Sequence, residues 1–138
     1  MKIYVTGLGV VSGIGIGVSE NIEALRQRKH GIGKVTLFPT ALDVPVSEVK
    51  RSNEELKQLI SLPPQRTVSR TALLGMIAAE EAMKDAGLTP PLRIGFISAT
   101  SVGGMDLSEH FYESFKKDPG QGLSLIHISE PTRLALIS

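Results

Sequence analysis

Closely spaced glycines near the N-terminus are the first residues whose pattern could do chemistry. After an expected strand at 2–6, the stretch TGLGVVSGIGIG places glycine at positions 7, 9, 13, 15 and 17. A dinucleotide loop needs G-x-G-x-x-G before a helix, so that backbone N–H groups meet the pyrophosphate. Gly7 and Gly9 fit, but the third position holds Ser12, and residues 33–38 lack the acidic side chain that would bind the ribose. We interpret the glycines as a tight strand-to-helix connection and keep an NAD(P)-binding short-chain oxidoreductase as an alternative.

Side chains that could act as nucleophiles, bases or metal ligands are scarce. The sequence has no cysteine, which excludes a thiolate metal site or a cysteine nucleophile within these residues. His30 is expected at the end of a helix and His110 on an amphipathic helix, and we interpret both as structural. Ser12, Ser98 and Ser101 lie near glycines without the G-x-S-x-G frame of a nucleophile elbow. We therefore assign no catalytic residue, no metal site and no cofactor.

Composition narrows the class of protein. The 138 residues are enough for one domain or less. A net charge of +1 without a basic block argues against nucleic-acid binding. No apolar run approaches the roughly 20 residues of a membrane span, and the N-terminus lacks the pattern of a signal peptide. We therefore expect a cytoplasmic protein.

Hydrophobic periodicity predicts an alternation of strands and helices. Strands are expected at 2–6 and 93–100, an extended stretch at 33–38, and helices over about 18–30, 52–60, 68–86 and 106–117. Strand 93–100 is almost continuously apolar, as strands covered on both faces are, and helix 68–86 is expected to be buried on most sides. This order predicts an α/β layered sheet in which the two strands are neighbours. Because the other strands of such a sheet are missing, we expect the chain to aggregate.

Residues at the helix ends strengthen these predictions. Ser19 is expected to cap the first helix, and Gly31 to provide its left-handed stop. Ser52 and Glu55 have the spacing of a capping box at the start of the second helix. Gly87 is expected to end the long third helix.

Four segments resemble β-ketoacyl-acyl-carrier-protein synthases, the condensing enzymes of the thiolase-like superfamily. The segments are VTGLGVVSGIGIGVSENIEAL, HGIGKVTLF, VSRTALLGMIAAEEAMKDAGL and RIGFISATSVGGMD, and they follow one another in the family's order. The chain departs from the family at Gly13, where relatives commonly carry proline or alanine, and at Ala99 and Ser101, where glycines are common. The resemblance covers residues 1–117.

The resemblance implies an incomplete N-terminal part of a thiolase-like α/β fold, with a mixed sheet layered between helices. It also implies decarboxylative Claisen condensation of acyl and malonyl thioesters in fatty-acid or polyene/polyketide-type synthesis. Acyl carrier protein would be the partner, in a homo- or heterodimer, without a cofactor. The family's cysteine nucleophile would follow residue 122, so this chain is expected to be inactive. Val102 matches a position that borders the acyl pocket, although an ordinary loop residue is an equal alternative.

A non-catalytic synthase homologue, serving as a chain-length partner subunit, would have the same N-terminal half. The residue at the position of the cysteine nucleophile would separate that alternative from an active synthase. We expect residues 1–122 to be part of the synthase domain. Residues 123–138, LSLIHISEPTRLALIS, resemble a translated sequencing adaptor, so we expect them to be a non-native tail.

Overall fold

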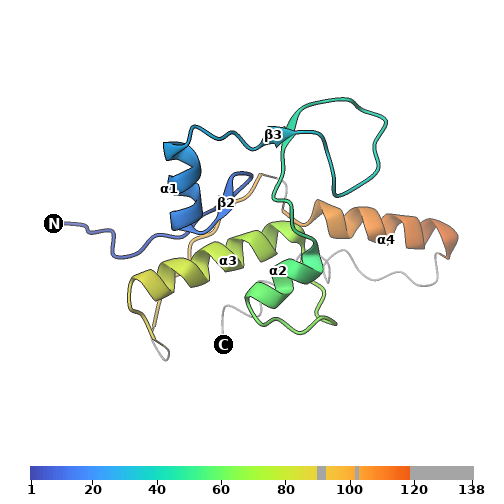
Figure 1. Ribbon diagram of the computed structural model, residues 1–138. Helices are drawn as coiled ribbons and strands as arrows, with labels where there is room; N and C mark the ends of the chain where they lie inside the picture. Colours follow the sequence, from blue (N-terminus) through green and yellow to red (C-terminus); the bar gives the residue numbers. More distant parts are fainter. Residues whose placement is uncertain (90–92, 102, 119–138) are drawn as a thin grey trace. The chain divides into compact units, whose positions relative to one another are not determined.

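The computed structural model describes residues 1–89, 93–101 and 103–118. Within them the elements are β1 (Val11–Ser12), β2 (Gly15–Ile16), α1 (Val18–Arg26), β3 (Ile32–Gly33), β4 (Val46–Ser47), α2 (Asn53–Leu59), α3 (Arg70–Asp85) and α4 (Met105–Lys117) (Figure 1). The chain divides into two compact units. The first contains Met1–Arg66 and Leu73–Phe96, and the second contains Thr67–Ala72 and the chain from Ile97 onward.

In the first unit, both sheets are short antiparallel pairs. β1 pairs with β2 across the glycine-rich stretch, with Val11 opposite Ile16. β3 pairs with β4, with Ile32 opposite Ser47, and so closes the loop between them. The Glu48 carboxylate holds this loop, accepting hydrogen bonds from the Thr36 N–H and hydroxyl, both at 2.7 Å. The Thr36 hydroxyl is the main cause of a lowered pKa at Glu48.

The expected strands at 2–6 and 93–100 are wrong as elements of this structure. Residues 2–6 and 93–100 form neither helix nor strand, and they are exposed throughout. A strand persists when its backbone N–H and C=O groups find a ladder partner, and neither segment has one within the described part of the chain. Of the extended stretch expected at 33–38, Gly33 alone lies in a strand, as the second residue of β3.

Apolar burial is small and lies in the first unit. Among the described residues, Leu56 and Leu73 are completely buried, and Ala24 and Ile77 are nearly so. The expected burial of the third helix on most sides is therefore wrong. The buried residues of α3 are Leu73 and Ile77, whereas Met76 on the same helix is 41% exposed.

The first helix departs from its predicted ends. α1 begins at Val18 with Gly17 as N-cap, at φ 95°, so the N-cap residue has no side chain to cap the helix and the prediction for Ser19 is wrong. At the other end Arg28, at φ 53°, takes the left-handed position expected for Gly31. The Lys29 N–H donates to the Ala24 carbonyl at 2.8 Å, which closes the turn.

Gly31 serves a different purpose. A Cβ atom there would lie 2.4 Å from the carbonyl oxygen of Gly13, so glycine is required for close approach of two loops. In contrast, Gly87 ends α3 as predicted, and it adopts the left-handed conformation, at φ 66°. The Leu88 N–H donates back to the Met83 carbonyl at 3.0 Å.

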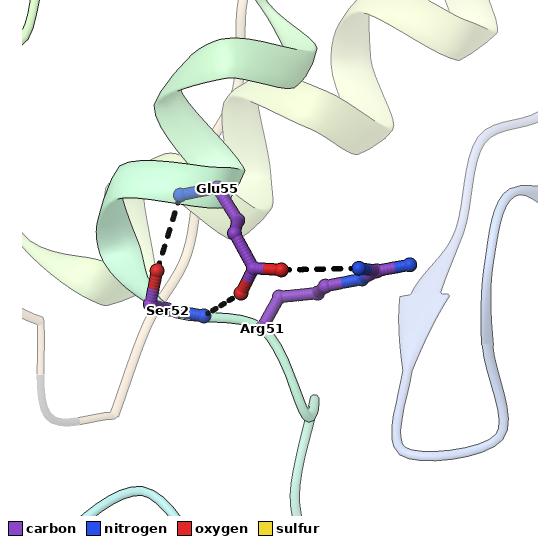
Figure 2. A network of polar contacts seen from close by, with 3 residues as sticks. All are labelled: Arg51, Ser52 and Glu55. Carbon is purple, nitrogen blue, oxygen red and sulfur yellow. Dashed lines mark hydrogen bonds and ion pairs between the residues drawn. The ribbon is translucent and has the colours of Figure 1, made fainter.

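The predicted capping box at the start of α2 is confirmed (Figure 2). The Glu55 N–H donates to the Ser52 hydroxyl at 3.2 Å, and the Ser52 N–H donates to the Glu55 carboxylate at 2.7 Å. Arg51 donates to the other carboxylate oxygen at 3.1 Å. These contacts, the Ser52 amide first, hold the pKa of Glu55 below its ordinary value.

In the second unit, α4 confirms the amphipathic helix expected over 106–117. Its N-cap is Gly104, at φ 83°. The Asp106 carboxylate accepts a hydrogen bond from the Arg70 N–H at 2.7 Å, at the start of α3, where the first amides of a helix have no partner within it. Phe111 and Phe115 lie one turn apart, with ring centroids 5.9 Å from each other.

The capping box makes the stability of α2 dependent on pH. Because the folded pKa of Glu55 is lowered, its stabilisation is complete above the unfolded pKa and is lost as pH falls through the folded pKa. We expect hydrogen-exchange protection of the α2 amides, corrected for intrinsic rates, to fall in that acidic range. Glu55→Gln should remove this dependence, whereas the neighbouring Glu54→Gln should keep it. An unchanged acid response in Glu55→Gln would contradict this role.

Candidate functional site

The structure brings the glycine-rich loop, residues 7–17, against one side of α3. The Glu81 carboxylate accepts hydrogen bonds from the Val10 N–H at 3.0 Å and from the Val18 N–H at 2.7 Å. One helical turn later, the Asp85 carboxylate accepts from the Leu8 N–H at 2.9 Å. Two carboxylates spaced by four residues therefore hold three backbone amides of the loop and of the helix that follows it.

Glycine lets the backbone of this loop come close to α3. A Cβ atom on Gly7 would lie 2.2 Å from the Ala82 carbonyl oxygen, and one on Gly9 would lie 1.9 Å from that of Ala78. Alternate residues of an extended chain are about 6.6 Å apart, and four residues of a helix rise about 6 Å. The two spacings match, so glycines two apart meet alanines four apart on the helix.

The interior of the loop is held by one buried side chain. Asn21, in α1, is 7% exposed. Its amide group donates to the Gly15 and Gly17 carbonyls at 2.9 and 2.8 Å. Its side-chain oxygen accepts the hydroxyl hydrogen of Ser12, whose oxygen in turn accepts from the Ile14 N–H. Ser12 is thus a structural member of the loop and has no base beside it.

This arrangement does not favour the phosphate-binding alternative. A phosphate would need free N–H groups at the loop and at the start of α1. The amides of Leu8, Val10 and Val18 already donate to the carboxylates of Glu81 and Asp85, whose charge would also repel a phosphate. The interpretation of the glycines as a tight connection therefore fits the structure.

The remaining residues singled out in the sequence do not form a catalytic cluster in the described chain. His30, in the segment between α1 and β3, and His110, in α4, are both exposed. Ser98 and Ser101 lie in an exposed segment without helix or strand. No group of three or more metal-ligating side chains is found within residues 1–89, 93–101 and 103–118. Val102, the predicted acyl-pocket residue, lies outside the described residues.

Sequence reasoning missed Glu81 and Asp85, the residues that position the loop. A signal for them was present, since acidic residues at 81 and 85 accompany alanines at 78, 82 and 86 on one helix. Small residues four apart mark a face that a backbone can approach closely, and the carboxylates lie beside it.

Among the helices that the structure describes, none has the length and apolar composition needed to span a membrane.

Comparison with known proteins identifies the family. The model of the beta-ketoacyl synthase N-terminal domain matches residues 1–126. The chain belongs to the β-ketoacyl synthase family. The expected α/β, thiolase-like fold class follows from that membership, and the helices and small sheets of the structure are consistent with part of such a fold.

The curated relatives agree with this assignment. Nodulation protein E of Rhizobium meliloti (strain 1021) is 30% identical over 128 residues, covering 86% of this chain and 30% of the relative. A 3-oxoacyl-[acyl-carrier-protein] synthase 2 of Coxiella burnetii is 30% identical over 122 residues, covering 82% and 28%. One of Staphylococcus aureus (strain MRSA252) is 28% identical over 113 residues, covering 79% and 27%. The chain thus spans under a third of the length of each of these relatives. No solved structure gave a significant match.

Removing the Glu81 carboxylate should release the glycine loop. Glu81→Ala leaves the Val10 and Val18 amides without acceptors, and hydrogen bonds to charged groups contribute about 1.5–3 kcal/mol each. We expect a loss of about 2 kcal/mol or more in protection of these two amides from hydrogen exchange. Glu80→Ala is the matched control, because Glu80 pairs with Lys84 at the surface, where such a pair contributes about 0.3–0.5 kcal/mol. Equal effects of the two substitutions would contradict the anchoring role.

The contact between the glycine loop and α3 should require glycine at position 9. Gly9→Ala would push a methyl group into the backbone of α3, at a cost of about 1–3 kcal/mol or more. Gly33→Ala should be tolerated, because nothing lies within 4 Å of a Cβ atom there. Hydrogen exchange at the Val10 amide should distinguish the two variants. If Gly9→Ala leaves the protection unchanged, the close approach is not required.

Proposed function

We propose that the protein to which this chain belongs condenses acyl and malonyl thioesters held on acyl carrier protein, with loss of carbon dioxide. The observation that carries the proposal is the family match over residues 1–126. It is supported by relatives named as 3-oxoacyl-[acyl-carrier-protein] synthases. Relatives from Streptomyces that are named as polyketide β-ketoacyl synthases suggest that the product belongs to fatty-acid or polyketide-type synthesis.

The proposed chemistry requires groups that these 138 residues do not contain. A cysteine thiolate takes the acyl group from its carrier thioester and forms an acyl-enzyme. Loss of carbon dioxide from the malonyl thioester gives a carbanion, which attacks the acyl carbonyl and displaces the cysteine sulfur. The developing oxyanions need hydrogen-bond donors. With no cysteine in the sequence, the chain by itself is proposed to be inactive.

A non-catalytic partner subunit that sets chain length is the alternative. The alternative shares the N-terminal segments of an active synthase. The two proposals differ in one residue of the complete protein: an active synthase has a cysteine at the nucleophile position, and a non-catalytic subunit has another residue there.

Further parts of the proposal concern assembly and chain organisation. Acyl carrier protein is the proposed partner, a homo- or heterodimer the proposed assembly, and the cytoplasm the proposed location. Residues 1–122 are proposed to be part of the synthase domain, and residues 123–138 a non-native tail, although the family match ends at residue 126. Reading the genomic DNA beyond the codon for Gly122 would test that boundary directly.

The activity proposal has a direct assay. The purified chain is incubated with an acyl-carrier substrate and malonyl-carrier protein, and elongation is followed by mass spectrometry of the carrier. We expect no elongated product, and we expect elongation by the complete protein under the same conditions. Elongation by the 138-residue chain would contradict its proposed inactivity. A complete protein without activity and without a cysteine at the nucleophile position would favour the partner-subunit alternative.

Val102 is proposed to border the acyl pocket of the complete protein. Val102→Phe should then shorten the acyl chains that are accepted, because a larger side chain fills part of the pocket. We expect the ratio of kcat/KM for long against short acyl substrates to fall about tenfold, as a difference of one or two methylenes in a pocket does. Val44→Phe, at a residue 47% exposed in the loop between β3 and β4, is the control. An unchanged ratio in Val102→Phe would identify Val102 as an ordinary loop residue.

A further inference from the structure

The loop between β3 and β4, residues 34–45, is held closed at few points. At its base, β3 and β4 pair over two residues each, and a pair that short is marginal by itself. Residues 36–45 are exposed throughout, so apolar burial does not hold the loop either. In Figure 1 it is the wide turn that follows β3. Its closed form therefore depends on polar contacts.

The Glu48 carboxylate, directly after β4, supplies such contacts. One oxygen accepts hydrogen bonds from the Thr36 N–H and hydroxyl, both at 2.7 Å, and the other accepts from the Leu37 N–H at 3.2 Å. A single side chain at one end of the loop thus holds three donors near the other end. Hydrogen bonds to an ionised acceptor are about twice as strong as neutral ones, so closure depends on the charge of Glu48.

Other charged groups near this contact have smaller effects. The pKa of Glu48 is lowered mainly by the Thr36 hydroxyl and to a smaller extent by the charge of Lys50. Lys34 and Asp43 form an ion pair across the loop at 3.3 Å, but their side chains are 85% and 84% exposed. An ion pair so open to water contributes little, which makes Asp43 a suitable control for Glu48.

The base of the loop is fixed by contacts that do not titrate. Ser47, in β4, lies against the position that a Cβ atom on Gly13 would occupy, and the backbones of Gly13 and Gly31 approach closely. These are steric contacts between neutral groups, so protonation of a carboxylate leaves them unchanged. The loop can therefore open while its base stays in place.

We propose that residues 34–45 form an acid-released strap, which ionised Glu48 holds closed and which opens locally when Glu48 takes up a proton. In the closed strap the contacts with Thr36 keep the pKa of Glu48 below its ordinary value, and opening removes them. Closure is therefore fully stabilised above the ordinary pKa, and the stabilisation is lost as pH falls through the pKa of the closed form. Exposed segments with little buried apolar surface open locally in this way. The strap does not depend on the proposed catalytic function.

Hydrogen exchange at neutral pH tests the role of the charge. Glu48→Gln keeps the size of the side chain and removes its charge, whereas Glu48→Ala removes the acceptor. We expect exchange of the Thr36 and Leu37 amides to accelerate on the order of fivefold in Glu48→Gln, and more in Glu48→Ala. Asp43→Asn is the matched control and should leave both amides unchanged. Equal rates in Glu48→Gln and Asp43→Asn would overturn the role of Glu48.

The glycine-rich loop provides an internal reference. The Val10 and Val18 amides, which donate to Glu81, should exchange at the wild-type rate in the Glu48 variants at neutral pH. A loss of protection there equal to the loss at Thr36 would show that the strap is not a local unit, and would overturn the proposal.

The acid response provides the second test. In the wild-type chain, protection of the Thr36 amide, corrected for intrinsic rates, should fall as pH drops below the ordinary pKa of a glutamate. Glu48→Gln should show low protection without this step, and Asp43→Asn should keep the step. If Glu48→Gln retains the wild-type step, another group releases the strap and the proposal is wrong.

Discussion

The carboxylate of Glu81 joins two points of the chain that are eight residues apart, the Val10 and Val18 amides. Between them lie the β1–β2 hairpin and the turn that starts α1. Without this acceptor, the first amide of α1 would lack a partner, since Gly17 offers no side chain and Ser19 lies too late to cap the helix. The loop can reach Glu81 only because Gly7 and Gly9 let its backbone lie against the alanines of α3. The hydrogen bonds to the Glu81 carboxylate therefore form only together with the close packing of Gly7 and Gly9 against α3.

The helix ends show two ways of satisfying the same backbone groups. At α2 the partners are local, because Ser52 and Glu55 exchange hydrogen bonds within one turn. At α1 and α3 they are distant in sequence, with Glu81 accepting from Val18 and Asp106 accepting from Arg70. A local cap is visible as a spacing in the sequence. A distant one is formed only when two elements meet.

This part of a β-ketoacyl synthase has structural features but no catalytic cluster among its described residues. The features built from its described residues are structural: an anchored glycine loop, a small apolar core and capped helices. His30 and His110 are exposed, and the Ser12 hydroxyl donates a hydrogen bond to the Asn21 side chain. The glycine loop resembles a nucleotide site in composition, but the acidic side chains that hold it leave its amides occupied. Composition alone could not have distinguished a nucleotide-binding loop from a tight structural connection.

The sequence by itself determined the family, the four helices, the capping box at Ser52 and the end of α3 at Gly87. Each of these depends on residues within a few positions of one another, or on segments in a recognisable order. The tertiary structure decided that Glu81 rather than Ser19 satisfies the start of α1, and that Arg28 rather than Gly31 adopts the left-handed turn. It also decided that residues 2–6 and 93–100 form no strand. The start of α1 and the missing strands share one physical reason, since a strand or a distant cap exists only where a second segment supplies the other half of its hydrogen bonds.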